Sequence, residues 1–169
     1  MNKSEVIVFP KLPENLDEIK QMAAAQDCFR SPFKMAALAV AVFCHYEKDV
    51  NQTIEMLNYI KGPRPLSTFD IQFIRDRLGG KGYVPRSYIT GTSVENDYTI
   101  PPGPIQITVS DNPYSYTNQD YATLFLHSSG ADSPRQVTLR HKLSTDEWFL
   151  WEHTFLSDIR TPQSQNPWA

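Results

Sequence analysis

An acid and an imidazole in the C-terminal third are the residues best placed to do chemistry. Over residues 104–160 apolar and polar residues alternate, which is typical of strands with one buried face. The alternation puts Glu152 and His141 on the face that otherwise carries leucine, valine and tryptophan. A carboxyl group buried there would have a raised pKa, as a general acid or base needs. One hypothesis is therefore a small-ligand-binding or enzymatic domain with a pocket over Glu152 and His141. In the alternative, both residues lie at sheet edges, or Glu152 pairs with an arginine such as Arg86 or Arg135.

The opposite face of the same strands mixes aromatic and polar side chains. The lengths of the hairpin loops put Phe125, Phe149 and Trp151 on this face and Trp148 on the core-facing one. Rows of exposed aromatic side chains are uncommon on monomers. We expect the mixed face to be covered by other parts of the chain or to form an interface. A homodimer through this face, or through Trp168 near the C-terminus, is the interface hypothesis.

Searches for a nucleophile and for a metal site give no candidate. The sequence has no Gly-x-Ser-x-Gly motif, and Cys44 lies in an apolar run expected to be buried. His127 and His153 fall in one row of the mixed face, but two strand spacings, about 9.6 Å, separate them, too far for one zinc ion. We predict no catalytic residue, metal or cofactor, and favour a non-enzymatic binding or protein-interaction domain over an enzyme.

Length, charge and cysteine content narrow the class of protein. The 169 residues fit a single domain, and a net charge of −3 offers no positive field to attract nucleic acid. The longest apolar run, 35–44, is half of the roughly 20 residues that span a bilayer, so no membrane segment is expected. Cys28 and Cys44 are expected to be reduced thiols and the N-terminus has no signal-peptide pattern, which together predict a cytoplasmic protein.

The chain divides into a mainly helical part (1–82), a sheet part (83–160) and a tail (161–169). Helical spacing and capping residues predict four helices, over 14–27, over 33–47, from Asp49 to before Gly62, and from Ser67 to Gly79. The period then changes to two, which predicts strands over 83–90, 105–110, 121–128, 135–142 and 147–154. An additional segment, Val6 to Phe9, suits a short edge strand or a docking arm.

These elements predict an α+β fold, with N-terminal helices packed on a C-terminal curved antiparallel sheet of about five strands. The helix over 33–47 is apolar on every side, so it should fill the concave side of the sheet. The layout is similar to the helix-plus-cone arrangement of nuclear-transport-factor-like folds, an analogy that implies no function.

Several stretches of the chain have distinctive sequences: Asn96-Asp97-Tyr98-Thr99, Asn112-Pro113-Tyr114-Ser115-Tyr116, Gly130-Ala131-Asp132-Ser133-Pro134-Arg135, Val137-Thr138-Leu139-Arg140, Trp148-Phe149-Leu150-Trp151-Glu152, Asp158-Ile159-Arg160 and Pro167-Trp168-Ala169. From about residue 31 to the C-terminus, they resemble an uncharacterised family of bacterial domains of unknown function, seen mostly in Firmicutes. The resemblance implies a bacterial, cytoplasmic setting. It implies no activity and assigns no site residues.

Overall fold

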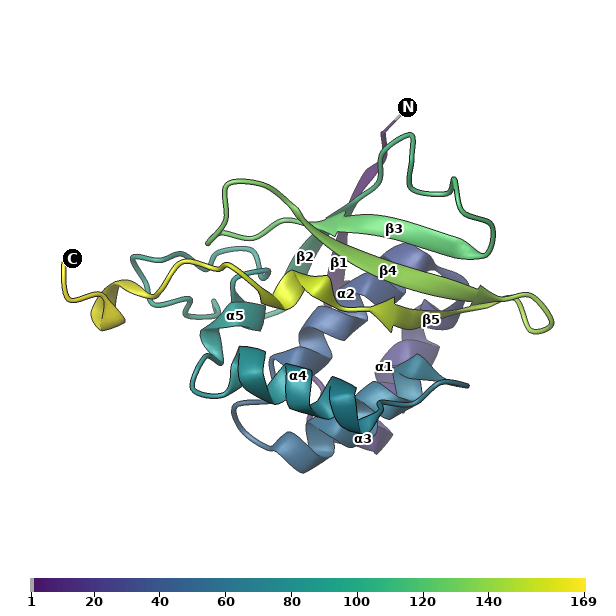
Figure 1. The fold of residues 1–169 in the computed structure, drawn as a ribbon, viewed down its shortest axis with the longest axis horizontal. Coiled ribbons are helices and arrows are strands. Elements are labelled where there is room, and N and C mark those ends of the chain that lie inside the picture. The colour runs from purple at the N-terminus through teal and green to yellow at the C-terminus, as the bar shows by residue number, and fades with distance from the viewer. Residues whose placement is uncertain (1) are drawn as a thin grey trace.

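A five-stranded antiparallel sheet curls over a central helix in the computed structural model, which describes residues 2–169 (Figure 1). The strands are paired in the order β1-β2-β3-β4-β5. In chain order the elements are β1 (Ser4–Phe9), α1 (Leu16–Gln26), α2 (Pro32–Phe43), α3 (Val50–Lys61), α4 (Thr68–Leu78), α5 (Tyr83–Arg86), β2 (Ile105–Ser110), β3 (Tyr121–Leu126), β4 (Arg135–Lys142) and β5 (Glu147–Glu152). Short 3-10 turns follow α1 (Cys28–Arg30) and β5 (Thr154–Leu156), and a third lies in the tail (Gln163–Gln165). The predicted α+β class, with helices on a curved antiparallel sheet, is confirmed.

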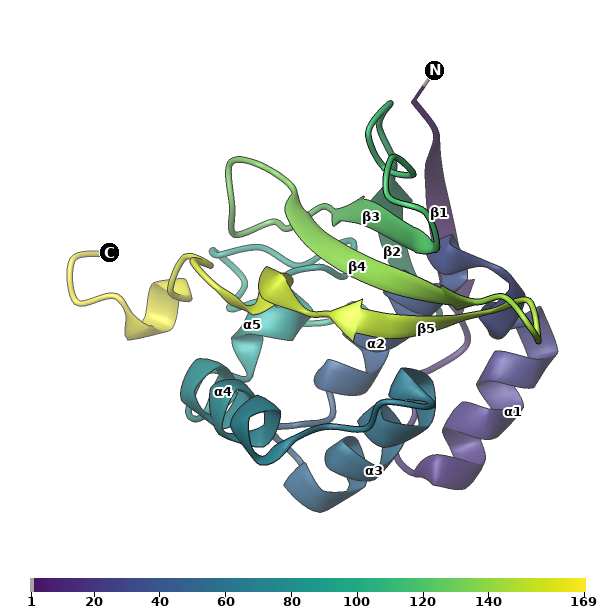
Figure 2. The same ribbon diagram turned by 45° about the vertical axis from the view of Figure 1, so that its right-hand side comes forward.

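Helix α2 is the centre of the hydrophobic core. Its start is fixed by the Ser31 side chain, which accepts a hydrogen bond from the Lys34 backbone N–H, and by Pro32 in the first turn. All of its other side chains from Phe33 to Phe43 except Lys34 are buried. The sheet covers one side of α2, and α1 and α3 lie on the other side (Figure 2). A helix that is apolar all round is stable only when covered in this way.

Helices α3 and α4 begin and end where the sequence predicts. The Asp49 side chain accepts a hydrogen bond from the Gln52 backbone N–H at the start of α3. Ser67 and Asp70 form a complete capping box at the start of α4. Both helices end at a glycine, so the segment between them is a short connection held at each end by defined caps.

The strand predicted over residues 83–90 is wrong. This segment begins with the helical turn α5 and meets the sheet only at its end, where Ile89 forms an isolated bridge to Ile107 and the Thr90 backbone N–H donates to the Gln106 carbonyl. The burial of the segment is nearly continuous and does not alternate as in a strand with one exposed face; the buried residues are Tyr83, Val84, Pro85, Ser87, Tyr88 and Ile89. The fifth strand is instead β1, which confirms the edge-strand interpretation of the N-terminal segment.

A β-bulge near the end of β5 reverses the alternation of the strand. Leu139 pairs with Leu150 while Thr138 pairs with Glu152, so Trp151 is the extra residue. Glu152 is therefore exposed on the outer face, and His153 is buried with 8% of its surface accessible. The expectations that Glu152 faces the core and that His153 shares the outer face with His127 are both wrong, because the bulge shifts every later residue by one position.

The described residues contain no helix of the length and apolar character that a bilayer crossing needs. Their buried apolar side chains belong to one cluster, which joins the sheet, α2 and the surrounding helices.

Candidate functional site

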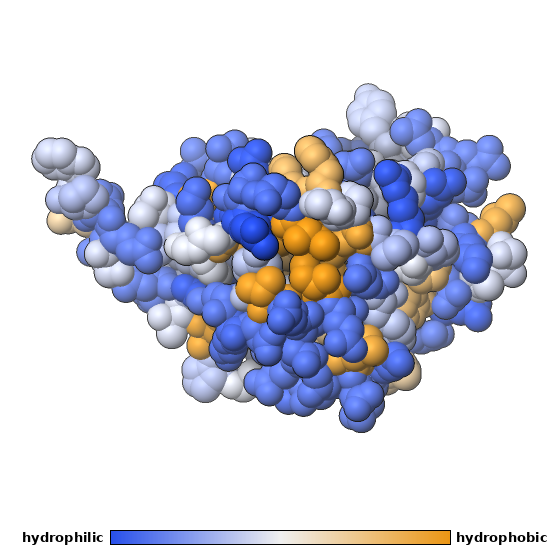
Figure 3. All heavy atoms as spheres, turned by 60° about the horizontal axis from the view of Figure 1, so that its bottom comes forward, coloured by the Kyte–Doolittle hydropathy of each residue, from blue (hydrophilic) through white to orange (hydrophobic). Residues whose placement is uncertain are grey.

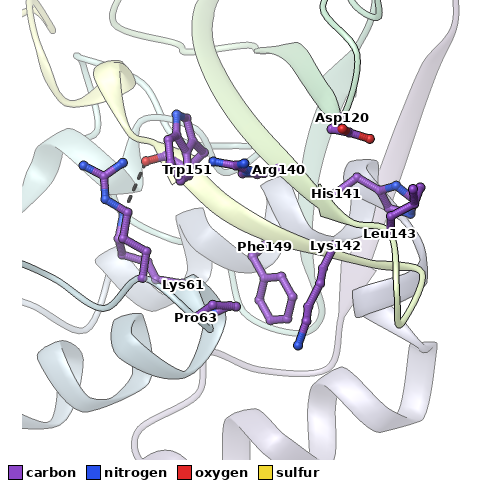
Figure 4. A pocket seen from close by; sticks show the side chains of 10 residues that line it. Lys61, Pro63, Asp120, Arg140, His141, Lys142, Leu143, Phe149 and Trp151 are labelled. Atoms are coloured by element: carbon purple, nitrogen blue, oxygen red, sulfur yellow. Dashed lines mark hydrogen bonds between the residues drawn. The ribbon is translucent and has the colours of Figure 1, made fainter.

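An open groove of about 480 Å³ lies between the outer face of β4 and β5 and the α3–α4 connection (Figure 4). Phe149 and Trp151 provide its aromatic surface. Its charged lining consists of four cations, Lys61, Arg64, Arg140 and Lys142, and one acid, Asp120. We call this site the basic groove. Although the chain has a net charge of −3, the groove concentrates positive charge.

Two arginines of the basic groove stack on the same indole ring. The guanidinium carbon of Arg64 lies 4.5 Å from the centre of the Trp151 ring, and that of Arg140 lies 4.7 Å from it. Arg140 also lies 5.2 Å from the centre of the Tyr121 ring. Cation–π contacts of this kind offset part of the repulsion between neighbouring cations, and a stacked guanidinium keeps its N–H groups available.

Neither stacked arginine has a carboxylate counter-ion in the described part of the chain. Within residues 2–169, Arg64 and Arg140 form no ion pair, whereas Arg30, Arg86 and Arg160 each pair with an acid. The two groove arginines are therefore held by aromatic contacts, and no acid of residues 2–169 neutralises their charge.

Lys61 connects α3 to the bulge that carries Trp151. Its ammonium donates a hydrogen bond to the backbone carbonyl of Trp151, with an Nζ–O distance of 3.2 Å. Burial lowers the pKa of Lys61, Arg64 lowers it further, and the carboxylates of Asp70 and Glu152 oppose this. Since β5 is an edge strand, its outward carbonyl would otherwise lack a strand partner. Lys61 therefore holds the edge of the basic groove.

A glycine allows the floor of the basic groove to lie close to α3. The ring of Phe149 packs at 5.4 Å from that of Phe29, centre to centre. Gly62, which ends α3, has φ +62°, and a Cβ at this position would lie 2.4 Å from the Phe149 ring. Only glycine provides both the backbone conformation and the space.

A second groove of about 630 Å³ adjoins the first on the outer face of the sheet, and Trp151 lines both. We call it the polar groove. Tyr121 provides a further aromatic wall. The polar lining includes Asn118, Gln119, Thr123, Gln136, Thr138 and Glu152. The residues that line it include neither lysine nor arginine, so the two grooves differ sharply in charge.

The two predicted ligand-binding residues lie in different grooves. His141 lines the basic groove, where its Nε2 lies 2.8 Å from Asp146 Oδ1 and its ring lies against Trp148. Glu152 lines the polar groove. The structure therefore does not bring Glu152 and His141 together over one pocket, because the bulge moves Glu152 to the outer face.

The four candidate interface residues are also separated. Phe149 and Trp151 line the basic groove, while Phe125 is half-buried and lines neither groove. Trp168 is 92% exposed in the tail, which extends away from the body of the molecule (Figure 1). Trp148 packs against the core, as predicted.

Sequence reasoning missed the importance of Arg64, Arg140 and His153. Strand alternation puts Arg140 on the same mixed face as Trp151, and this is the sequence signal that could have indicated a cation–aromatic site. Arg64 lies in a proline-rich connection whose path no local pattern predicts. The burial of His153 depends on the bulge, for which the sequence gives no local signal.

His153 lies between aromatic rings, and one of its ring nitrogens has no partner among the described residues. Its ring lies 5.7 Å from that of Phe43 and 5.8 Å from that of Phe73. Its Nδ1 is buried and has no hydrogen-bond partner within residues 2–169. Burial lowers the pKa of His153 to about 4, Lys61 lowers it further, and Asp70 opposes this. In the same residues, no three His, Cys, Asp or Glu side chains gather as a metal site would require.

The helical side of the molecule carries a central apolar area with a hydrophilic surround (Figure 3). On α3 and α4, Val50 and Phe69 are the exposed large apolar side chains, at 42% and 76% accessibility. Individual exposed apolar side chains are normal on protein surfaces, so neither of these two residues by itself indicates a site.

Comparison with known proteins gives a family but no function. Residues 11–163 match the family model described as Domain of unknown function (DUF6935). Searches of the curated proteins and of the solved structures found no match to the chain.

Proposed function

Because the chain belongs to the DUF6935 family, whose function is unknown, we propose a function from its geometry: a non-enzymatic binding domain whose basic groove takes a small anionic ligand. One observation carries this proposal. Arg64 and Arg140 are stacked on Trp151 and, within residues 2–169, have no acidic partner. Charge-assisted hydrogen bonds from guanidinium groups are the strongest that side chains offer to carboxylate or phosphate oxygens.

The size and composition of the basic groove support a small ligand. A volume of about 480 Å³ lies within the usual range of small-molecule sites, roughly 300–1,000 Å³. Aromatic side chains with a few fixed polar groups are typical of such sites. The arginines are also held on Trp151 before any ligand binds, which reduces the entropy lost on binding.

Titration with pyrophosphate at low ionic strength tests the proposal. We expect isothermal titration calorimetry to give measurable binding to the natural protein, and at least tenfold weaker binding to Arg64→Gln and Arg140→Gln. The matched control is Arg77→Gln, because the exposed Arg77 stacks on Phe73 at 5.0 Å but lies outside the basic groove. Absence of binding to the natural protein, or an equal loss in the control, would contradict the proposal.

We place this binding function in a single domain in the bacterial cytoplasm. The resemblance to bacterial domains supports the origin. Two buried free cysteines support a reducing compartment, and burial raises the pKa of Cys28 to about 11. The net charge of −3 argues against nucleic acid as the anionic partner. A nuclear-transport-factor-like relationship stays an analogy of layout. Fractionation of a bacterial host that carries the gene tests the compartment.

Self-association is the second candidate function, and the exposure of Trp168 favours it. A tryptophan that is 92% exposed at the end of a protruding tail suits insertion into a second copy of the chain. Multi-angle light scattering at high protein concentration should give a dimer, and Trp168→Ser should shift it to monomer. A monomer for the natural chain at the same concentration overturns this candidate.

A further inference from the structure

We propose that the ligand of the basic groove is an anionic sugar, whose hydroxyl-bearing part lies in the polar groove on the other side of Trp151. This inference rests on the proposed function, since the basic groove must first bind the anionic group. The ligands that fit this description have in common a sugar ring that carries a phosphate or a carboxylate group.

The polar groove offers hydrogen-bonding groups that have no partner among the described residues. Thr123 and Thr138 are opposed on β3 and β4, and Gln136 points to the same face of the sheet. The side chains of these three residues form no hydrogen bond to any other part of residues 2–169, although the Gln136 backbone carbonyl accepts one from Thr154. Amides and hydroxyls can both donate and accept, which suits the hydroxyl groups of a sugar.

The polar groups are also held by rigid elements. Thr123, Gln136 and Thr138 belong to paired strands, and the backbone N–H of Thr123 donates to the Ser115 carbonyl from the preceding loop. Groups placed on strands keep their geometry before the ligand arrives, so less entropy is lost on binding. Scattered surface threonines on loops would not have this property.

The charges of the two grooves would orient the ligand. The carboxylate of Glu152 lies in the polar groove, and the four cations lie in the basic groove. An anionic group is repelled by Glu152 and attracted by Arg64 and Arg140, whereas hydroxyl groups can donate hydrogen bonds to the Glu152 carboxylate. Only one orientation satisfies both ends of the site.

Three side chains join the two grooves. The rings of Tyr121 and Trp151 meet edge to face at 5.7 Å between centres, and Arg140 stacks on both. Arg140 and Trp151 lie next to each other on the outer face of the sheet (Figure 4). The N–H groups of Arg140 can therefore reach the anionic group and the first hydroxyl of the same ligand.

An acidic peptide fits this site less well than an anionic sugar. A peptide commonly binds a sheet by adding a strand to its edge. At β5, the carbonyl of Trp151 already accepts a hydrogen bond from Lys61, so this edge is partly occupied. The free polar groups lie on the face of the sheet, where they meet a compact ligand with many hydroxyls.

Calorimetric titration with matched pairs of small molecules tests the inference. We expect glucose 6-phosphate to bind at least tenfold more tightly than inorganic phosphate, or glucuronate at least tenfold more tightly than acetate. Comparison of the two pairs shows whether the anionic group of the ligand is a phosphate or a carboxylate. Gln136→Ala and Thr138→Val should each remove most of the additional affinity for the sugar acid. Neither variant should change the affinity for the simple anion. Thr145→Val is the matched control, since Thr145 is exposed in the β4–β5 hairpin outside both grooves.

The outcomes separate this inference from the proposed function. If pyrophosphate or phosphate binds but neither sugar acid binds more tightly than its simple anion, the sugar inference is overturned and the anion site stands. If no anion binds, both are overturned. Tighter binding of hexaglutamate than of either sugar acid also overturns the inference, in favour of a peptide ligand.

Discussion

The buried His153 should make the stability of this protein depend on pH in the range between neutral and pH 4. In the folded state the imidazole is 8% exposed, packed against Phe43 and Phe73, and has an Nδ1 with no partner within residues 2–169. Burial, aided by the nearby Lys61 ammonium and opposed by the Asp70 carboxylate, lowers the pKa from 6.5 to about 4. The folded state therefore binds a proton less readily than the unfolded chain.

The direction of the effect follows from this difference in proton binding. Above pH 6.5 the imidazole is neutral in both states, so His153 makes no pH-dependent contribution. As the pH falls from 6.5 to about 4, the unfolded chain gains a proton that the folded state excludes, and the free energy of unfolding falls. At about 1.4 kcal/mol per pH unit, the full loss is about 3 kcal/mol. Since native domains are stable by roughly 5–15 kcal/mol, this loss is large.

Urea unfolding at pH 7, 6, 5 and 4 measures the effect. His153→Phe keeps an aromatic ring between Phe43 and Phe73 but cannot titrate. Between pH 7 and pH 4 we therefore expect the natural protein to lose about 3 kcal/mol more of its free energy of unfolding than this variant does. His127→Gln is the matched control, because His127 is exposed, and it should keep the full loss. If His153→Phe and the natural protein lose equal stability between pH 7 and pH 4, the argument from burial is refuted.

Three further predictions test the packing of the structure. Gly62→Ala should lower the free energy of unfolding by about 1–3 kcal/mol, because alanine is strained at φ +62° and its Cβ would contact the Phe149 ring. Urea unfolding measures this free energy, and an unchanged value would contradict the prediction. Ser67→Ala should cost about 1 kcal/mol by removing the N-cap of α4, whereas Ser67→Asp should retain most of the stability in the same assay. The thiols of Cys28 and Cys44 should react with a disulfide reagent only after unfolding, since burial raises the pKa of both. Rapid reaction of the folded protein would contradict this prediction.

Most of the helical part was predictable because its signals are local. Ser31, Asp49 and Ser67 each precede a helix and accept a backbone hydrogen bond at its start. The continuous apolar run of α2 also predicted its central position. In the sheet, the ends of the segments 105–110 and 135–142 match those of β2 and β4.

The errors come from features that local patterns do not determine. Residues 83–90 contain β-branched and aromatic residues typical of strands, yet they form a helical turn in which Tyr83 and the following Tyr88 are both buried. For β5, strict alternation predicted the inward and outward faces correctly up to Trp151 and failed from Glu152 onward. A bulge is chosen by tertiary packing, in this case by the contacts of the edge strand with α3 and the loop after it.

The bulge links the packing of the edge strand to the candidate site. Without it, Trp151 would still face outward, but Glu152 would point toward the core and His153 away from it. With the bulge, Trp151 and Glu152 both lie on the outer face of the sheet. Trp151 contacts Arg64 and Arg140, and Glu152 lines the polar groove. His153 is buried in the core. The same Trp151 residue supplies the carbonyl that Lys61 binds. The hydrogen bond from α3 thus offsets the free energy lost where the bulge interrupts strand pairing. The same bulge places two chemically different grooves on either side of Trp151.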